Sequence, residues 1–190
     1  EAVVAHDAVG DEVARPGRYV VEAHRQAEGL DGFDSVSAGK VLGRYFPEVV
    51  ANVAAIGDGP FVLDGELIIP MDGGLSFDAL QMRLHPAESR IRKLSKEIPA
   101  LFVAFDLPSV EDRDLMAEPL TARRVAREKF LAAPHEGIRL SPMTRDRADA
   151  QRWLDSAGGF LDGVICKRID GPYLPAERAM LKVKRIRSAD

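Results

Sequence analysis

Five short apolar runs dominate this sequence, and each has the length of a β-strand rather than of a helix. They cover residues 18–24, 61–70, 100–108, 160–169 and 179–187. The last run alternates strictly, with Leu181 and Val183 on one face of the predicted strand and lysines on the other. No apolar run approaches the roughly 18 residues of a membrane-spanning helix, so we expect no membrane association. The chain must therefore bury its apolar side chains in a sheet.

Helical patterns lie between these runs. Apolar residues recur at helical spacing over residues 44–56, 75–84, 120–133 and 147–159. Pro134 and the glycine pair at 158–159 are typical helix stops. Strands and helices mix without a strict βαβ alternation, and no repeat or linker divides the chain. We therefore expect one α+β domain over residues 1–190, with an antiparallel or mixed sheet flanked by helices.

Composition narrows the class of protein. Hydrophobic residues make up 46% and charged residues 29% of 190, which excludes a disordered chain or a coiled-coil rod. The single cysteine, Cys166, excludes a disulfide framework and a Cys-only zinc site, and fits a cytoplasmic protein. The formal net charge is −4, but residues 167–187 hold seven Lys or Arg against two acids. That stretch is a candidate anion site.

The tripeptide Asp64-Gly65-Glu66 is the first candidate for chemistry. Side chains alternate along a strand, so Asp64 and Glu66 point to the same face. Two acids there require a metal ion, a ribose or basic partners, because an unpaired buried charge is costly. A solvated turn explains the pattern equally well.

Phe105-Asp106 lies at the end of one apolar run, and Asp162 lies at the start of another. The plain interpretation of the first is a core phenylalanine followed by an aspartate that caps the next turn. Asp162 stands at the mouth of the strand that carries Lys167, where a carboxylate can hold Mg²⁺ together with water. Alternation puts Asp162 and Lys167 on opposite faces of a regular strand, so they share a site only if Asp162 lies at a bent entry.

Lys182 and Lys184 form the last candidate. On a strand they share one face and stand about 7 Å apart. Two like charges aimed at one place favour an anion between them, and a triphosphate is such an anion. The alternative is a solvated basic edge that protects the sheet from aggregation.

The order of these motifs is more specific than any one of them. DGEL (64–67), FDL (105–107), DGVICKR (162–168) and KVK (182–184) follow one another as in the covalent nucleotidyltransferases, which include DNA ligases, RNA ligases and capping enzymes. The chain resembles most the small bacterial ATP-dependent DNA ligases, through GRYFPEVV (43–50), LSFDALQMRLHPAESRIRKL (75–94) and PYLPAER (172–178). The resemblance implies the ATP-grasp-like adenylation domain of such a ligase. It would adenylate itself on a lysine with ATP and Mg²⁺, then pass AMP to the 5′-phosphate of nicked DNA during repair.

The resemblance also implies roles for six residues. Glu66 corresponds to the family's acid near the ribose and the metal ion, and Asp162 stands where many members have a metal-binding Glu. Phe105 corresponds to the aromatic residue that stacks on adenine, and Lys167 belongs to the nucleotide-binding set. Lys182 and Lys184 correspond to the catalytic pair that binds the triphosphate and assists attack on the α-phosphate. Cations and a carboxylate-held Mg²⁺ suit this chemistry, which depends on positioning and charge neutralisation.

One family feature is missing. The nucleophile of the family is the lysine of a K-x-D-G motif, and this sequence contains no such string. Gly29 occupies the lysine place before Leu30-Asp31-Gly32, and a second alignment puts Arg15 there, which cannot lose its proton. The basic residue of a nearby turn is replaced by Ser37.

These departures leave the nucleophilic lysine unknown and two explanations open. Either residues around the active site are missing from this sequence, which the intact remaining motifs favour, or the protein is degenerate at the first step. The second explanation predicts a module that binds a nucleotide or nucleic acid without covalent chemistry. An RNA ligase or guanylyltransferase relative is a further alternative. We also expect the OB-fold domain that the family usually carries to be absent from this chain.

Overall fold

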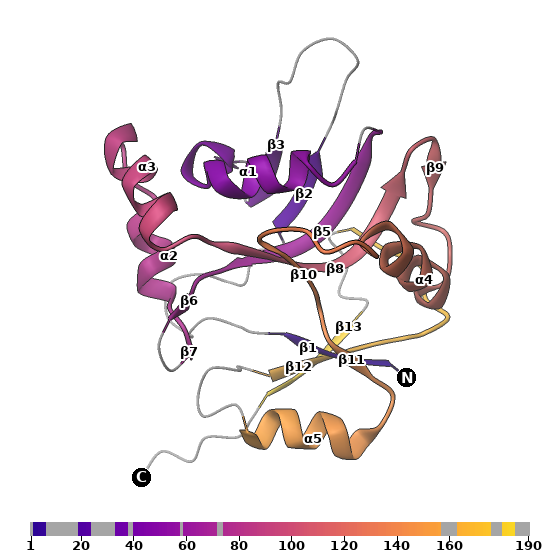
Figure 1. Ribbon diagram of the computed structural model, residues 1–190. Helices are drawn as coiled ribbons and strands as arrows, with labels where there is room; N and C mark the ends of the chain where they lie inside the picture. Colours follow the sequence, from indigo (N-terminus) through magenta and orange to yellow (C-terminus); the bar gives the residue numbers. More distant parts are fainter. Residues whose placement is uncertain are drawn as a thin grey trace.

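The computed structural model describes residues 2–6, 19–23, 33–37, 40–57, 59–71, 74–156, 163–175 and 180–184. Two sheets lie one above the other in this part of the chain (Figure 1). Helix α1 (Pro47–Ala54) covers one face of the larger sheet, and the smaller sheet lies beyond its other face. Helix α5 (Arg147–Ser156) packs on the far side of the smaller sheet.

The larger sheet has the strand order β10-β8-β5-β2-β3-β4, with β9 paired to β8. Only the β10–β8 pair is parallel among the described strands, so the sheet is mixed, as the sequence predicted. Its strands are β2 (Tyr19–Ala23), β3 (Phe33–Ser37), β4 (Lys40–Val41), β5 (Phe61–Ile68), β8 (Leu101–Val110), β9 (Arg113–Asp114) and β10 (Ile138–Leu140).

The smaller sheet is antiparallel throughout, with the order β11-β1-β12-β13. Its strands are β1 (Ala2–His6), β11 (Met143–Thr144), β12 (Gly163–Lys167) and β13 (Met180–Lys184). A short hairpin joins β6 (Pro70–Met71) to β7 (Gly74–Leu75). The remaining helices are a 3₁₀ turn at Gly43–Tyr45, α2 (Phe77–Arg83), α3 (Glu88–Glu97) and α4 (Leu120–Phe130). The α+β expectation is confirmed.

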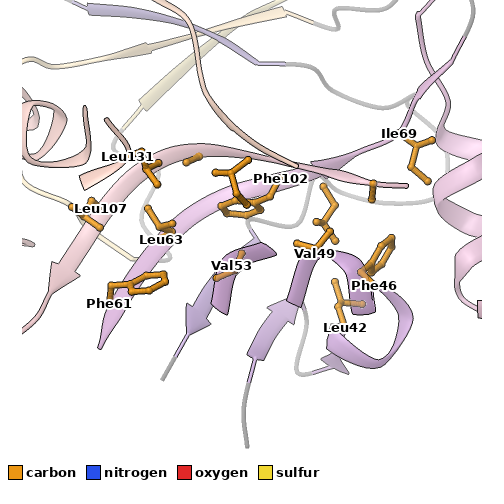
Figure 2. Close-up of a cluster of buried hydrophobic side chains, with 14 of the residues drawn as sticks. Leu42, Phe46, Val49, Val53, Phe61, Leu63, Ile69, Phe102, Leu107 and Leu131 are labelled. Carbon is orange, nitrogen blue, oxygen red and sulfur yellow. The ribbon is translucent and has the colours of Figure 1, made fainter. Parts of the chain in front are cut away.

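The main core lies between α1 and the larger sheet (Figure 2). Val49 and Val53 of α1 are buried against a layer that includes Leu63 of β5 and Phe102 of β8. Gly65 is the tightest point, because an added Cβ would lie 2.3 Å from the Val103 carbonyl oxygen and 2.4 Å from the Phe102 ring. Only glycine fits between the two acids of the DGE motif, and β5 and β8 approach closely there as a result.

Arg83 joins two of the sequence motifs. Its guanidinium is fully buried at the end of α2 and donates to the Tyr45 carbonyl oxygen at 2.8 Å and to Glu48 Oε2 at 2.7 Å. The other Glu48 oxygen accepts from the Ala100 amide at 3.0 Å. The guanidinium carbon also lies 4.8 Å from the centre of the Phe46 ring. Residues 43–50 and 75–94 therefore meet in a structural junction that fixes α1, α2 and the start of β8.

Candidate nucleotide-binding site

The face of β5 away from the core carries the two predicted acids. Phe61, Leu63 and Leu67 point to α1, so alternation puts Asp64 and Glu66 on the opposite face, which is turned toward the smaller sheet (Figure 1). Glu66 is half-buried. Asp64 is only 5% exposed, so its carboxylate depends on basic groups nearby.

Strand β8 is irregular where it passes these acids. Gly65 pairs with Ala104, whereas Asp64 pairs with Asp106, and the register has shifted again at Val62. Extra residues in one strand re-aim its side chains, and such bulges are frequent beside functional sites. The interpretation of Asp106 as a turn cap is therefore wrong, because it lies inside a strand that continues to Val110. Phe105 is half-buried and stands outside the main core.

A charge cluster surrounds Asp106. Arg123 of α4 donates from Nε to Asp106 Oδ1 at 2.8 Å and from Nη2 to Oδ2 at 3.0 Å, and both side chains are almost fully buried. Burial by itself would raise the pKa of Asp106, but the hydrogen bonds from Arg123 and the nearby charge of Lys167 outweigh it and hold the pKa below the ordinary 3.8. Asp106 is therefore a buried carboxylate anion with a matched partner.

Lys167 reaches this cluster from the smaller sheet. It ends β12, its side chain is 12% exposed, and its Nζ lies 3.9 Å from Asp106 Oδ2. Burial lowers the pKa of Lys167, opposed by the charges of Asp106 and Asp64 and assisted by those of Arg127 and Arg123. The Lys167–Asp106 contact shows that this face of β12 is turned toward the larger sheet.

The pairing of β12 with β13 places the two catalytic candidates on that same face. Lys182 lies opposite Ile165 and Lys184 opposite Gly163, and Lys167 follows Ile165 by two residues. Paired residues share a face, and residues two apart share a face, so these three lysine positions lie on one side of the sheet. The structure describes the backbone of Lys182 and Lys184 but not their side chains. Asp162 lies outside the described residues.

Sequence reasoning missed Asp106, Arg123 and Arg127 as members of this cluster. Arg127 is buried on α4 and donates from Nη1 to the Ala104 carbonyl oxygen at 3.1 Å. Burial, followed by the charge of Arg124, lowers the pKa of Arg127 to about 10. The spacing in the sequence could have indicated the two arginines, because Leu120, Arg123 and Arg127 fall on one face of the helix. All three are buried.

The described residues hold no group of three or more His, Cys, Asp and Glu side chains that would bind a metal ion by themselves. Mg²⁺ usually takes one or two carboxylates and completes its shell with water and phosphate oxygens. Glu66 is half-buried on the face of β5 turned toward the smaller sheet, and its carboxylate could be one of these one or two ligands. No helix in the described ranges is long and apolar enough to cross a membrane.

Two facing sheets, one with a row of lysine positions and one with an acid-bearing strand, are consistent with a nucleotidyltransferase fold. The family model described as "ATP dependent DNA ligase domain" matches residues 32–184, and the chain belongs to this family. The match contains all six predicted site residues, whereas Arg15 and Gly29, the two positions considered for the nucleophile, precede it.

Named relatives agree with the family. DNA ligase C2 of Mycolicibacterium smegmatis is 47% identical over 150 residues, which are 77% of this chain and 42% of that protein. DNA ligase C of Mycobacterium tuberculosis is 45% identical over 152 residues, with the same coverage of 77% and 42%. The chain thus spans less than half the length of these curated relatives.

Solved structures support the fold. The ligase domain of LigD from M. tuberculosis has a TM-score of 0.63 at 24% identity, and the match covers 96% of this chain and 53% of that one. A mycobacterial DNA ligase D complexed with ATP and MES has a TM-score of 0.64 at 23% identity, covering 96% and 54%.

Proposed function

We propose that residues 1–190 form the adenylation domain of an ATP-dependent DNA ligase, which takes AMP from ATP and passes it to a DNA 5′-phosphate during nick sealing in repair. The observation that supports this most is the register that puts Lys167, Lys182 and Lys184 on the face of the smaller sheet turned toward the larger one. The family resemblance further suggests an OB-fold partner domain that acts with it on nicked DNA.

Each residue type suits a part of this reaction. Phe105 and Glu66 are both half-buried. In this proposal the ring of Phe105 stacks on adenine and Glu66 contacts the ribose. Lys182 and Lys184 neutralise the phosphates, together with Lys167 on the same face of the neighbouring strand β12. Mg²⁺ bound by Glu66 and Asp162 would supply further neutralisation of phosphate charge. Charge neutralisation that grows toward the transition state raises the rate of phosphoryl-type transfer.

Covalent labelling tests the proposal. The protein is incubated with α-³²P-ATP and Mg²⁺, and we expect label that survives denaturation. Lys184→Ala and Lys182→Ala should each slow labelling strongly with little change in melting temperature, and the double variant should be less than additive because both lysines act on one phosphate group. Lys93→Ala, on an exposed position of α3, is the matched control and should label normally. Normal labelling by Lys184→Ala would refute the catalytic role of β13.

A second function is favoured by one sequence fact, the absence of a K-x-D-G lysine. In that case the domain binds ATP, or a nucleic-acid end, without becoming labelled. Equilibrium binding of a fluorescent ATP analogue separates the two: binding with stable label supports the ligase, and binding without label supports the non-covalent module.

A further inference from the structure

Arg123 contacts a strand of the larger sheet and the segment that follows a strand of the smaller sheet. From α4 its Nε and Nη2 hold Asp106 of β8, in the larger sheet. Its Nη1 donates to the carbonyl oxygens of Gly171 at 3.1 Å and Glu118 at 2.5 Å. Gly171 belongs to residues 168–174, which follow β12 of the smaller sheet and which we call the post-β12 segment. One guanidinium therefore ties a strand of one sheet to the segment that leaves the other.

Backbone hydrogen bonds surround this contact. The amides of Leu120 and Thr121, which begin α4, donate to the Gly171 and Ile169 carbonyl oxygens at 3.0 and 3.1 Å. The Tyr173 amide donates to the Met116 carbonyl oxygen at 2.8 Å, and the Tyr173 ring centre lies 5.8 Å from the Arg123 guanidinium carbon. The post-β12 segment is thus held against the start of α4, and Lys167 immediately precedes it.

The two sheets share no strand among those described, so contacts between them must set their separation. Glu66 and Phe105 lie on the larger sheet, whereas Lys167, Lys182 and Lys184 lie on the smaller one. An ATP molecule bound by both groups needs them at one fixed spacing, because a misplacement of about 1 Å can cost about 100-fold in rate.

We infer that Arg123 is a positioning residue, which clamps Asp106 and the post-β12 segment together and so sets where the lysine-bearing strands stand relative to Glu66 and Phe105. This inference rests on the proposed function. The side chain must be arginine, because its planar fork gives two parallel bonds to the carboxylate and still leaves Nη1 for the carbonyl oxygens. Lysine offers a single charged point and cannot make both sets of bonds.

The test compares Arg123→Gln and Arg123→Lys with Arg83→Lys. Arg83 and Glu48 form another buried arginine–carboxylate pair, on the α1 side of the larger sheet, and Arg83→Lys is therefore the matched control. The first measurement is hydrogen exchange at the amides of Leu120, Thr121 and Tyr173. The second is the dissociation constant of ATP, from titration with a fluorescent ATP analogue.

In Arg123→Gln, the three amides should lose protection while core amides such as that of Phe102 keep theirs. The dissociation constant of ATP should rise about 10–100-fold, by analogy with the loss of a group that orients a metal-binding residue. Arg123→Lys should fall between this variant and the parent. Arg83→Lys should lower stability and leave both measurements at parental values.

Full protection of the three amides in Arg123→Gln, or parental ATP affinity in that variant, would overturn the inference. If Arg123→Gln does not fold, the same outcomes in Arg123→Lys decide. A parent that binds no ATP would contradict the proposed function, and the exchange measurement would then decide alone whether Arg123 holds the post-β12 segment.

Discussion

Replacing Arg83 with methionine tests whether the GRYFPEVV and LSFDALQMRL motifs hold the fold rather than the nucleotide. The change removes the partner of Glu48, whose side chain is only 16% exposed, and leaves the Tyr45 carbonyl oxygen without its donor. Loss of one member of a buried ion pair costs about 3–5 kcal/mol. Glu48 keeps its hydrogen bond from the Ala100 amide and some contact with solvent. We therefore expect the loss in free energy of unfolding to lie at the lower end of this range, about 3 kcal/mol.

In a domain of this size each kcal/mol corresponds to about 2–4 °C, so Arg83→Met should melt about 6–12 °C below the parent. Urea unfolding should show a lower midpoint with an unchanged slope, since the surface exposed on unfolding stays the same. Adding Glu48→Gln should cost less than the sum of the two single changes, because both remove one interaction. The affinity for ATP should not change. A melting temperature within about 2 °C of the parent would refute the reasoning.

Three other substitutions test separate features. Gly65→Ala should lower stability by at least about 1–3 kcal/mol in urea unfolding, because its Cβ has no room, whereas Gly57→Ala, which meets nothing within 4 Å, should be close to neutral. Because the pKa of Asp106 is lowered in the folded state, its contribution to stability is present above the ordinary 3.8 and is lost as the pH falls through the folded value. Urea midpoints between pH 7 and pH 2 should therefore drop less on acidification in Asp106→Asn than in the parent. Phe105→Ala should weaken ATP binding by about 1–3 kcal/mol with little change in melting temperature, and unchanged affinity would exclude adenine stacking there.

The main strands were predictable because their burial follows the sequence. All five apolar runs contain a strand, and β5 alternates around Leu63 and Leu67 as a half-buried strand must. The predicted run 100–108 contained Asp106, and β8 continues to Val110. The interpretation of Asp106 as a turn cap was wrong, because the Arg123 bonds hold this side chain inside the strand.

The charge cluster was harder to foresee because it depends on contacts far apart in sequence. An arginine at a core position of a helix gives no indication of its partner, and Arg123 finds one on β8 and another after β12. The common face of Lys182 and Lys184 was predictable from alternation, but their relation to Lys167 required the β12–β13 register. The resemblance, in turn, indicated the family that the comparisons show.

The place of β1 within the smaller sheet has a kinetic consequence. This strand lies between β11 and β12, and its Val3 pairs with Cys166, so its partners follow it only after most of the domain has been synthesised. Synthesis proceeds at about 5–20 residues per second, so β1 must wait several seconds for a partner while the larger sheet begins to form. Closing so long a loop is entropically costly and slow. The lysine-bearing sheet should therefore assemble after the larger sheet, and the nucleotide binding that we propose should appear only once the smaller sheet has formed.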